Sequence, residues 1–177
     1  MEKKIIKNLE VIEAMLYYWH ALKDKEKVAE KFIYDIAEMP GLTDAYDEEF
    51  DGESVRRALS AIKNRESFTS RTKKEARFWN NNLWMMEDLG YTDTMVQPLK
   101  LLNLDGLAES LGEFAESKSF EELEVIFAPL HFDDYYVKGN KLIINFFKVK
   151  PEENKAYIGE QELIDYVREK LVELLKR

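Results

Sequence analysis

The sequence predicts a mainly helical α+β single domain with a small antiparallel sheet near its C-terminus. Helical hydrophobic periodicity dominates the first 95 residues, strand-like segments flank a Gly-Asn pair between 135 and 149, and a last helical pattern closes the chain. The order of helices, sheet and helix is typical of α+β proteins rather than of doubly wound sheets. At 177 residues, one domain is the default, with a helical part at about 1–95 packed on a sheet-containing part at about 98–177.

The helical part contains four predicted helices. Pro40-Gly41 is a typical helix stop, and Thr72 with Glu75 has the spacing of a capping box. An acidic loop at 42–53 separates the second helix from the third. The predicted helices are 3–23, 28–39, 52–65 and 72–89.

The second part has the clearest strand signals. Gly139-Asn140 between two apolar segments predicts a hairpin at about 135–149, and a final helix at about 160–176 makes about five main helices in all. Periodicity leaves 99–104 open as a strand or a helical turn. The remaining expectations are a short helix at 105–116, a capping box at Ser119 and Glu122, and a strand at 124–130.

Composition limits the class of protein. No cysteine is present, which excludes disulfides, thiol nucleophiles and thiolate metal sites and is compatible with a reducing cytoplasm of bacterial type. The N-terminus has no apolar signal core, and no run of about 18 apolar residues exists. We therefore expect a soluble cytoplasmic protein without a membrane partner.

Charge is strongly segmented along the chain. The segment Ser54–Arg77, called the basic strip, holds eight basic and two acidic residues in a chain of net charge −9. The ten residues before it, 44–53, hold six acids and no base. The strip either packs against the acidic loop and neutralises it, or stays free to bind an anion.

The fourth predicted helix carries the candidate ligand-binding residues, which are Arg71, Lys73, Arg77, Asn81 and Trp84. The last four share a polar face at helical spacing. A tryptophan beside basic residues can hold a phosphate, a nucleotide or a nucleic-acid single strand by charge and stacking. The start of this helix at Thr72 also offers backbone N–H groups to an anion.

His131 and Asp133 are the candidate acid–base residues, although no catalytic residue is assigned from them. A histidine with nearby acids can polarise a water or hold a divalent metal. A metal site needs more ligands, and His20 is the only other histidine. The favoured interpretation is a turn with acidic caps, and no metal site is predicted.

The acidic loop resembles the start of a calcium-binding loop but lacks its end. Asp47, Glu49, Asp51 and Gly52 occupy offsets 1, 3, 5 and 6, while Ala58 occupies offset 12, where a bidentate Glu is needed. We interpret the loop as solvated or as facing a partner.

Asn82 falls inside the apolar arc of the fourth helix, where a buried amide must find partners. It either fixes a neighbouring loop or reads a ligand in a pocket. Asn8 has a comparable place on the first helix, and the two amides could meet across a helix pair.

No phosphate-binding loop, dinucleotide fingerprint, nucleophile elbow or zinc helix occurs, and no cofactor is expected. The leading hypothesis is a non-catalytic binding protein that meets a protein partner, or itself, through the acidic loop or the Arg/Lys/Trp face. The alternative is an anion- or phosphate-binding protein, extending to an enzyme on a phosphorylated small molecule, that uses the basic 71–84 face. Net acidity disfavours nucleic acid.

Overall fold

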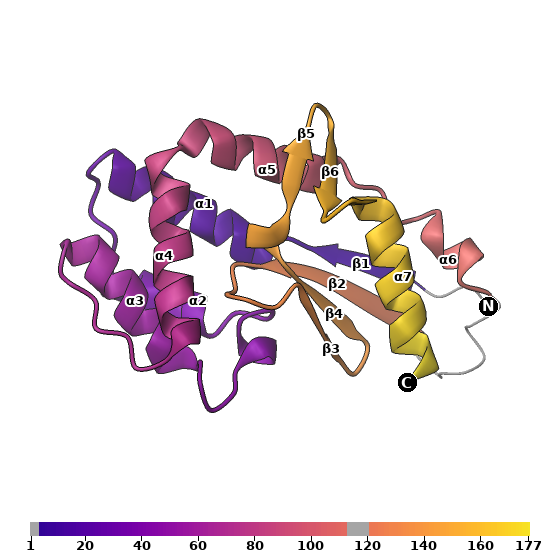
Figure 1. Ribbon diagram of the computed structural model, residues 1–177, viewed down its shortest axis with the longest axis horizontal. Helices are drawn as coiled ribbons and strands as arrows, with labels where there is room; N and C mark the ends of the chain where they lie inside the picture. The colour runs from indigo at the N-terminus through magenta and orange to yellow at the C-terminus, as the bar shows by residue number, and fades with distance from the viewer. Residues whose placement is uncertain (1–3, 113–120) are drawn as a thin grey trace.

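The computed structural model describes residues 4–112 and 121–177 and confirms the α+β fold class (Figure 1). The helices are α1 (Glu10–Lys23), α2 (Glu30–Ala37), α3 (Gly52–Asn64), α4 (Lys73–Glu87), α5 (Leu89–Leu101), α6 (Leu107–Ser110) and α7 (Leu163–Lys176), with short 3₁₀ turns at Thr43–Ala45 and Phe146–Lys148. The strands are β1 (Lys4–Asn8), β2 (Glu122–Ala128), β3 (Tyr135–Lys138), β4 (Lys141–Asn145), β5 (Lys150–Glu152), β6 (Lys155–Ile158) and β7 (Gln161–Glu162).

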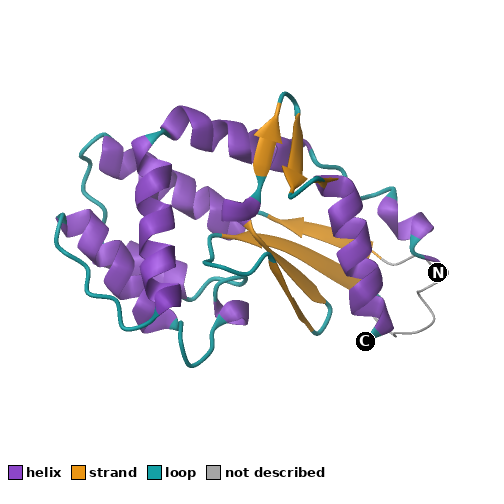
Figure 2. Cartoon of the chain, in the orientation of Figure 1, coloured by secondary structure: helices purple, strands orange, loops and turns teal. Residues whose placement is uncertain are grey.

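The main sheet is mixed and has the strand order β1-β2-β4-β3. The predicted hairpin is β3 and β4, which pair antiparallel, while β1, β2 and β4 run parallel. Most residues of the central strands β2 and β4 are buried, as expected for strands covered on both faces. In Figure 2 this sheet lies between the helices of the first half and α7.

Residues 4–8 form strand β1, so the prediction of a helix from residue 3 is wrong at its start. Ile5 and Leu9 fit the helical stripe, but Ile5-Ile6 is also a good strand pair. β1 pairs with β2, which lies far along the chain, so local periodicity could not reveal the partner. α1 therefore begins only at Glu10.

The connection after α2 comes very close to the sheet. Gly41 has a φ of +98°, and a Cβ there would lie 2.8 Å from Cγ2 of Ile126. Glycine is needed both for the left-handed backbone and for the space. Its backbone N–H donates to Asp44, whose carboxylate pairs with Lys141 of β4.

Helix α5 was not predicted. Asp88 accepts a hydrogen bond from the backbone N–H of Tyr91, and this cap starts a new helix directly after α4. α5 contains Gly90 and Pro98, two residues that the sequence favours as breakers. Residues 99–101, left open between strand and helix, are helical.

Lys7 of β1 fixes the end of α5. Its ammonium donates to the backbone carbonyls of Leu99, Lys100 and Leu102 at 2.7, 3.0 and 2.8 Å. The last carbonyls of a helix lack partners within the helix, and a lysine satisfies them with a favourable charge. The first strand and the middle of the chain are thus tied together.

The C-terminal third differs from the prediction mainly by a second sheet. β5, β6 and β7 form a small antiparallel sheet where a closing loop was expected, and α7 agrees with the predicted final helix. Glu122 begins a strand rather than a helix. Residues 113–116 of the predicted short helix, and Ser119, lie outside the described residues.

Candidate functional site

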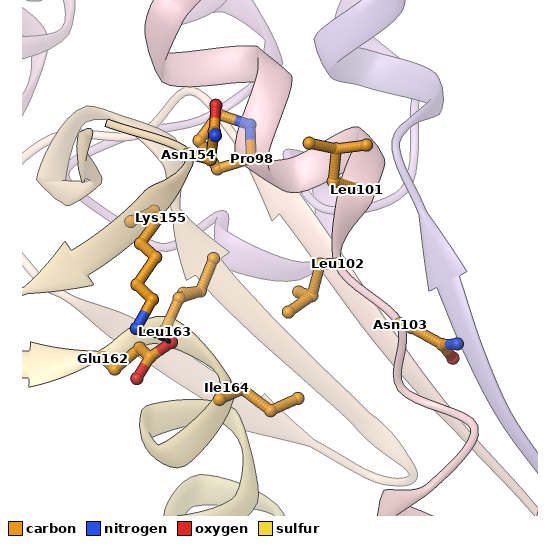
Figure 3. Close-up of a pocket in the computed structure, with 10 residues that line it drawn as sticks. Pro98, Leu101, Leu102, Asn103, Asn154, Lys155, Glu162, Leu163 and Ile164 are labelled. Carbon is orange, nitrogen blue, oxygen red and sulfur yellow. Dashed lines mark ion pairs between the residues drawn. The ribbon is translucent and has the colours of Figure 1, made fainter. Parts of the chain in front are cut away.

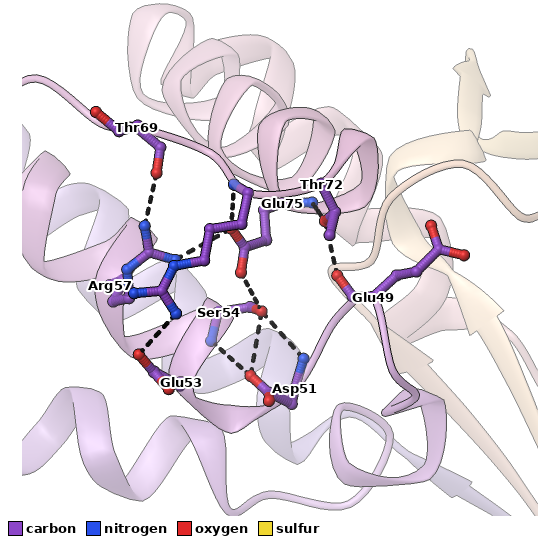
Figure 4. Close-up of polar contacts among 9 residues, drawn as sticks. Glu49, Asp51, Glu53, Ser54, Arg57, Thr69, Thr72 and Glu75 are labelled. Atoms are coloured by element: carbon purple, nitrogen blue, oxygen red, sulfur yellow. Dashed lines mark hydrogen bonds and ion pairs between the residues drawn. The ribbon is translucent and has the colours of Figure 1, made fainter.

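The start of α4 is held by a buried carboxylate. Glu75 is 5 % exposed and accepts hydrogen bonds from the Ser54 hydroxyl (2.6 Å), the Arg57 guanidinium (3.1 Å) and the backbone N–H of Arg71 (2.8 Å) (Figure 4). Burial alone would raise the pKa of Glu75, but these donors outweigh it and hold the pKa below its ordinary value. Thr72 caps the helix as predicted, accepting from the backbone N–H of Glu75.

This arrangement affects the expected anion site at the helix start. A helix N-terminus favours a negative charge, and here the Glu75 carboxylate of the chain itself supplies one. The Thr72 hydroxyl is also engaged, because it donates to the backbone carbonyl of Glu49. The donors that an external phosphate would need are thus partly occupied from within.

Half of the basic strip is paired with acids. Lys74 and Arg71 reach Asp47 and Glu53 of the acidic loop, so the strip does pack against that loop. The four pairs are Arg57–Glu75, Lys63–Glu30, Arg71–Glu53 and Lys74–Asp47. Most of them are at least partly exposed, so their role is mainly to cancel charge.

Four candidate residues share one side of α4, together with a neighbour from the segment between β2 and β3. We call Lys73, Arg77, Asn81, Trp84 and Phe132 the α4 face. Trp84 is 63 % exposed, and the Arg77 guanidinium lies 4.7 Å from the centre of the Phe132 ring. Within the described residues, Lys73 has no ion pair and Asn81 no side-chain hydrogen bond. Arg71 is directed elsewhere, toward Glu53.

Phe132 was missed as a member of this face. It follows β2 in sequence, and only the fold brings it beneath a residue of α4. The one available signal was its place in the polar segment 131–134, where a large apolar side chain has no strand or helix to bury it.

His131 and Asp133 differ in exposure and in hydrogen-bond partners. Residues 131–134 form bends rather than a strand; the His131 ring is buried, and Asp133 is exposed. Asp133 accepts from the Tyr136 hydroxyl, whereas His131 Nδ1 accepts from the backbone N–H of Phe132. Within the described residues the two side chains make no hydrogen bond to each other, although the Asp133 charge acts on the His131 ring, and their acid–base role stays a prediction.

The His131 ring is enclosed by Phe50 and Tyr136, and its Nε2 atom has no hydrogen-bond partner in the described residues. Burial, and then the nearby Lys74 ammonium, lower the pKa of His131 to about 4. The residue is neutral at pH 7, with the proton on Nε2 because Nδ1 is an acceptor.

The segment that carries Phe132 is held by Asn145, a residue that sequence reasoning did not select. Its fully buried amide donates to the carbonyls of His131 and Asp133 and accepts from the backbone N–H groups of Leu130 and Phe147. One side chain thus fixes the segment after β2 against the turn after β4. A polar residue ending an apolar strand was its only sequence signal.

The two asparagines that the sequence singled out do not meet. Asn82 is buried and accepts from the Trp19 indole N–H at 3.0 Å, while donating to the backbone carbonyl of Phe78. Asn8 donates to Glu124 on the neighbouring strand. Asn82 therefore joins α4 to α1.

The carboxylates of the acidic loop have structural roles. Asp51 caps α3 by accepting from the backbone N–H of Ser54, and Asp47 accepts from the backbone N–H groups of Glu49 and Phe50. Across residues 4–112 and 121–177, no three His, Asp or Glu side chains are grouped as metal ligands. No helix in the same ranges is long and apolar enough to cross a membrane.

A small cavity of about 210 Å³ lies between the end of α5 and the second sheet (Figure 3). Pro98, Leu102 and Ile164 provide apolar walls, and a long Lys155–Glu162 ion pair of 3.9 Å lies at one side. It is smaller than a usual small-molecule site, and none of the predicted site residues lines it.

Comparisons with protein-family models, with curated proteins and with solved structures found no match to this chain. The class of protein is therefore defined by its fold and surfaces alone: an α+β protein whose exposed candidate residues gather on one side of α4.

Proposed function

We propose that this chain is a non-catalytic binding protein whose α4 face meets a protein partner. The observation that carries the proposal is Trp84, a 63 % exposed indole on the same side of a helix as an unpaired lysine and an arginine. Tryptophan and arginine are enriched where interfaces gain most of their energy. The cytoplasm is the compartment we propose, because the chain lacks cysteine.

The charge on this face indicates the chemistry of the partner. Lys73 is unpaired and Arg77 is held by a ring rather than by an acid, so both charges are available. The rest of the chain is acidic, so these cations mark a local positive area. The matching surface is an apolar pocket for the indole, bordered by carboxylates.

The anion-binding alternative has less support. The start of α4 is occupied by Glu75, and Arg71 pairs with Glu53. Lys73 and Arg77 remain for an anion, but no cavity described above lies beside them.

Site-specific photocrosslinking tests the proposal. A photoreactive phenylalanine derivative is placed at position 84, and in a control at position 34, where Tyr34 is 54 % exposed on α2. We expect a discrete protein adduct from position 84 that Arg77→Glu reduces at least about tenfold, because the reversed charge repels an acidic partner. Identical adducts from both positions would overturn the proposal. The absence of any adduct, together with a monomer in sedimentation, would also overturn it.

A further inference from the structure

A groove lies on the opposite side of α4 from Trp84, between α1, α3 and α4. Its volume is about 540 Å³, within the range of roughly 300–1,000 Å³ usual for small-molecule sites. The walls are mostly apolar and come from all three helices: Leu22, Ala61, Ile62, Trp79, Leu83 and Met86. A second hollow of about 310 Å³ shares Leu22, Leu83 and Met86 and extends the groove along α4. We call this feature the α1–α3–α4 groove.

Trp79, one of the residues that line the groove, carries an unsatisfied donor. Trp79 is stacked on Phe68, with ring centres 5.9 Å apart, and its indole N–H is buried without an acceptor in the described residues. The contrast is Trp19, whose indole N–H donates to Asn82. Buried donors are normally paired, so this N–H lacks the kind of partner that Asn82 gives to Trp19.

Two cations in an unusual backbone conformation stand at the groove. Lys25 follows α1 with a φ of 59°, and Arg65 ends α3 with a φ of 56°. The next residue closes each helix in the same way: Glu26 donates to the carbonyl of Ala21, and Glu66 to that of Ala61. This closure normally carries glycine at the left-handed position, because any side chain is strained there.

The helix dipole does not account for both cations. A basic residue anywhere in the last turn complements a helix C-terminus, and Lys23 and Lys63 already lie there. Two charged residues at such positions line the same groove, and this coincidence motivates a binding role for them. Neither Lys25 nor Arg65 has an ion pair in the described part of the chain, whereas Lys63 is paired with Glu30.

We propose that the α1–α3–α4 groove binds a small amphipathic monocarboxylate, with its apolar body on the groove walls and its carboxylate at Lys25 and Arg65. The carboxylate class follows from Lys25 and Arg65, two cations that line the groove without an ion pair in the described residues. A single negative charge is favoured because Glu26 and Glu66 lie beside the cations and would repel a polyanion. The site lies apart from the α4 face, so the two proposals can fail independently.

Titration calorimetry of the intact chain with sodium dodecanoate, below its micelle concentration, is the first test. We expect one binding site, with affinity at least about tenfold weaker for the dodecyltrimethylammonium cation, which has the same tail and the opposite charge. Inorganic phosphate should give no heat of binding. Equal affinity for dodecanoate and dodecyltrimethylammonium would overturn the proposal. The absence of dodecanoate binding at millimolar concentration would also overturn it.

Glycine substitutions separate a binding role from a structural one. Lys25→Gly and Arg65→Gly should each weaken dodecanoate affinity about tenfold, as expected for a lost charge-assisted contact, while raising the Tm because backbone strain is relieved. Glu153→Gly is the matched control: Glu153 has a φ of 55° in the β5–β6 turn, so this change should raise the Tm and leave affinity unchanged. Unchanged affinity in both test variants would refute the assignment of Lys25 and Arg65.

Discussion

At the scale of single residues, buried polar groups determine how this protein responds to pH. The pKa of His131 is lowered from 6.5 to about 4 by burial and by Lys74. Above pH 6.5, folded and unfolded chains both carry a neutral ring. Between pH 6.5 and 4 only the unfolded chain gains the proton, so stability falls as pH falls.

We expect protonation of His131 in the unfolded chain to lower the free energy of unfolding by at most about 3 kcal/mol between pH 7 and pH 4. His131→Phe should make the free energy of unfolding less dependent on pH between pH 6.5 and 5, where most carboxylates are still ionised. The variant also loses the hydrogen bond from the backbone N–H of Phe132, which lowers its stability at every pH. Urea unfolding at several pH values measures this. His20→Gln is the control and should keep the decrease; a decrease that survives in His131→Phe contradicts the assignment.

Glu75 gives a second prediction at the residue scale. Glu75→Gln leaves the Arg57 guanidinium without its carboxylate and weakens the contacts to Ser54 and to the backbone of Arg71. We expect a loss of about 2–4 kcal/mol in urea denaturation, because an uncompensated charge remains in a partly buried place.

The matched change for Glu75→Gln is Asp35→Asn, which breaks the exposed Lys31–Asp35 pair. That change should cost no more than about 0.5 kcal/mol. Equal effects of the two substitutions would show that burial does not distinguish these carboxylates. The folded-state pKa of Glu75 lies below its ordinary value, so its contribution is present at neutral pH and is lost as pH falls through that lowered pKa.

At the scale of elements, the contact between Lys7 and α5 is the most specific long-range cap. Lys7→Met keeps a long apolar stem and removes three hydrogen bonds to helix carbonyls. We expect a loss of about 1–3 kcal/mol and faster amide hydrogen exchange in the last turn of α5. Lys100→Met, which removes a surface contact to Glu13, should change stability by less than about 0.5 kcal/mol. Unchanged exchange in Lys7→Met would contradict the capping role.

Element prediction from sequence succeeded where the signal was local. Helix α3, the Thr72 cap and the β3–β4 hairpin were predicted because helical apolar spacing, capping spacing and a Gly-Asn turn each act over a few residues. Strand β1 was predicted as helix because its partner is far along the chain. Helix α5 was missed because the Asp88 cap and packing outweigh the unfavourable Gly90 and Pro98.

The candidate site shows the same division between local and tertiary information. Helical spacing placed Lys73, Arg77, Asn81 and Trp84 on one side of α4, and the structure agrees. Spacing could not show that Arg71 turns to Glu53 or that Arg77 lies on Phe132, since both contacts join separate elements. The α1–α3–α4 groove depends on three helices and had no sequence signal.

At the scale of the whole molecule, the first strand joins the two parts of the chain. β1 belongs to the N-terminal part in sequence but to the main sheet in space. Removal of residues before 98 would leave the edge of β2 unpaired and expose its apolar side chains. We therefore expect the segment 98–177 alone to remain unfolded by circular dichroism and amide exchange.

The intact chain should unfold in one cooperative step. Calorimetric and van't Hoff enthalpies should agree, because α1 and β1 both contact β2 and Lys7 of β1 is hydrogen-bonded to the end of α5. Two separate transitions, or a folded 98–177 fragment, would show that the sheet-containing part is independent.

The three tryptophans lie at three depths of the molecule: Trp19 is fully buried, Trp79 is half-buried, and Trp84 is 63 % exposed. The fluorescence emission of each tryptophan should therefore report on a different event. Trp19 emission follows unfolding, Trp79 emission follows occupation of the α1–α3–α4 groove, and Trp84 emission should shift to the blue when a partner covers the α4 face. Phenylalanine at any two of the three positions leaves a single tryptophan, and selective excitation of its indole then follows unfolding, groove binding or partner binding without an added dye.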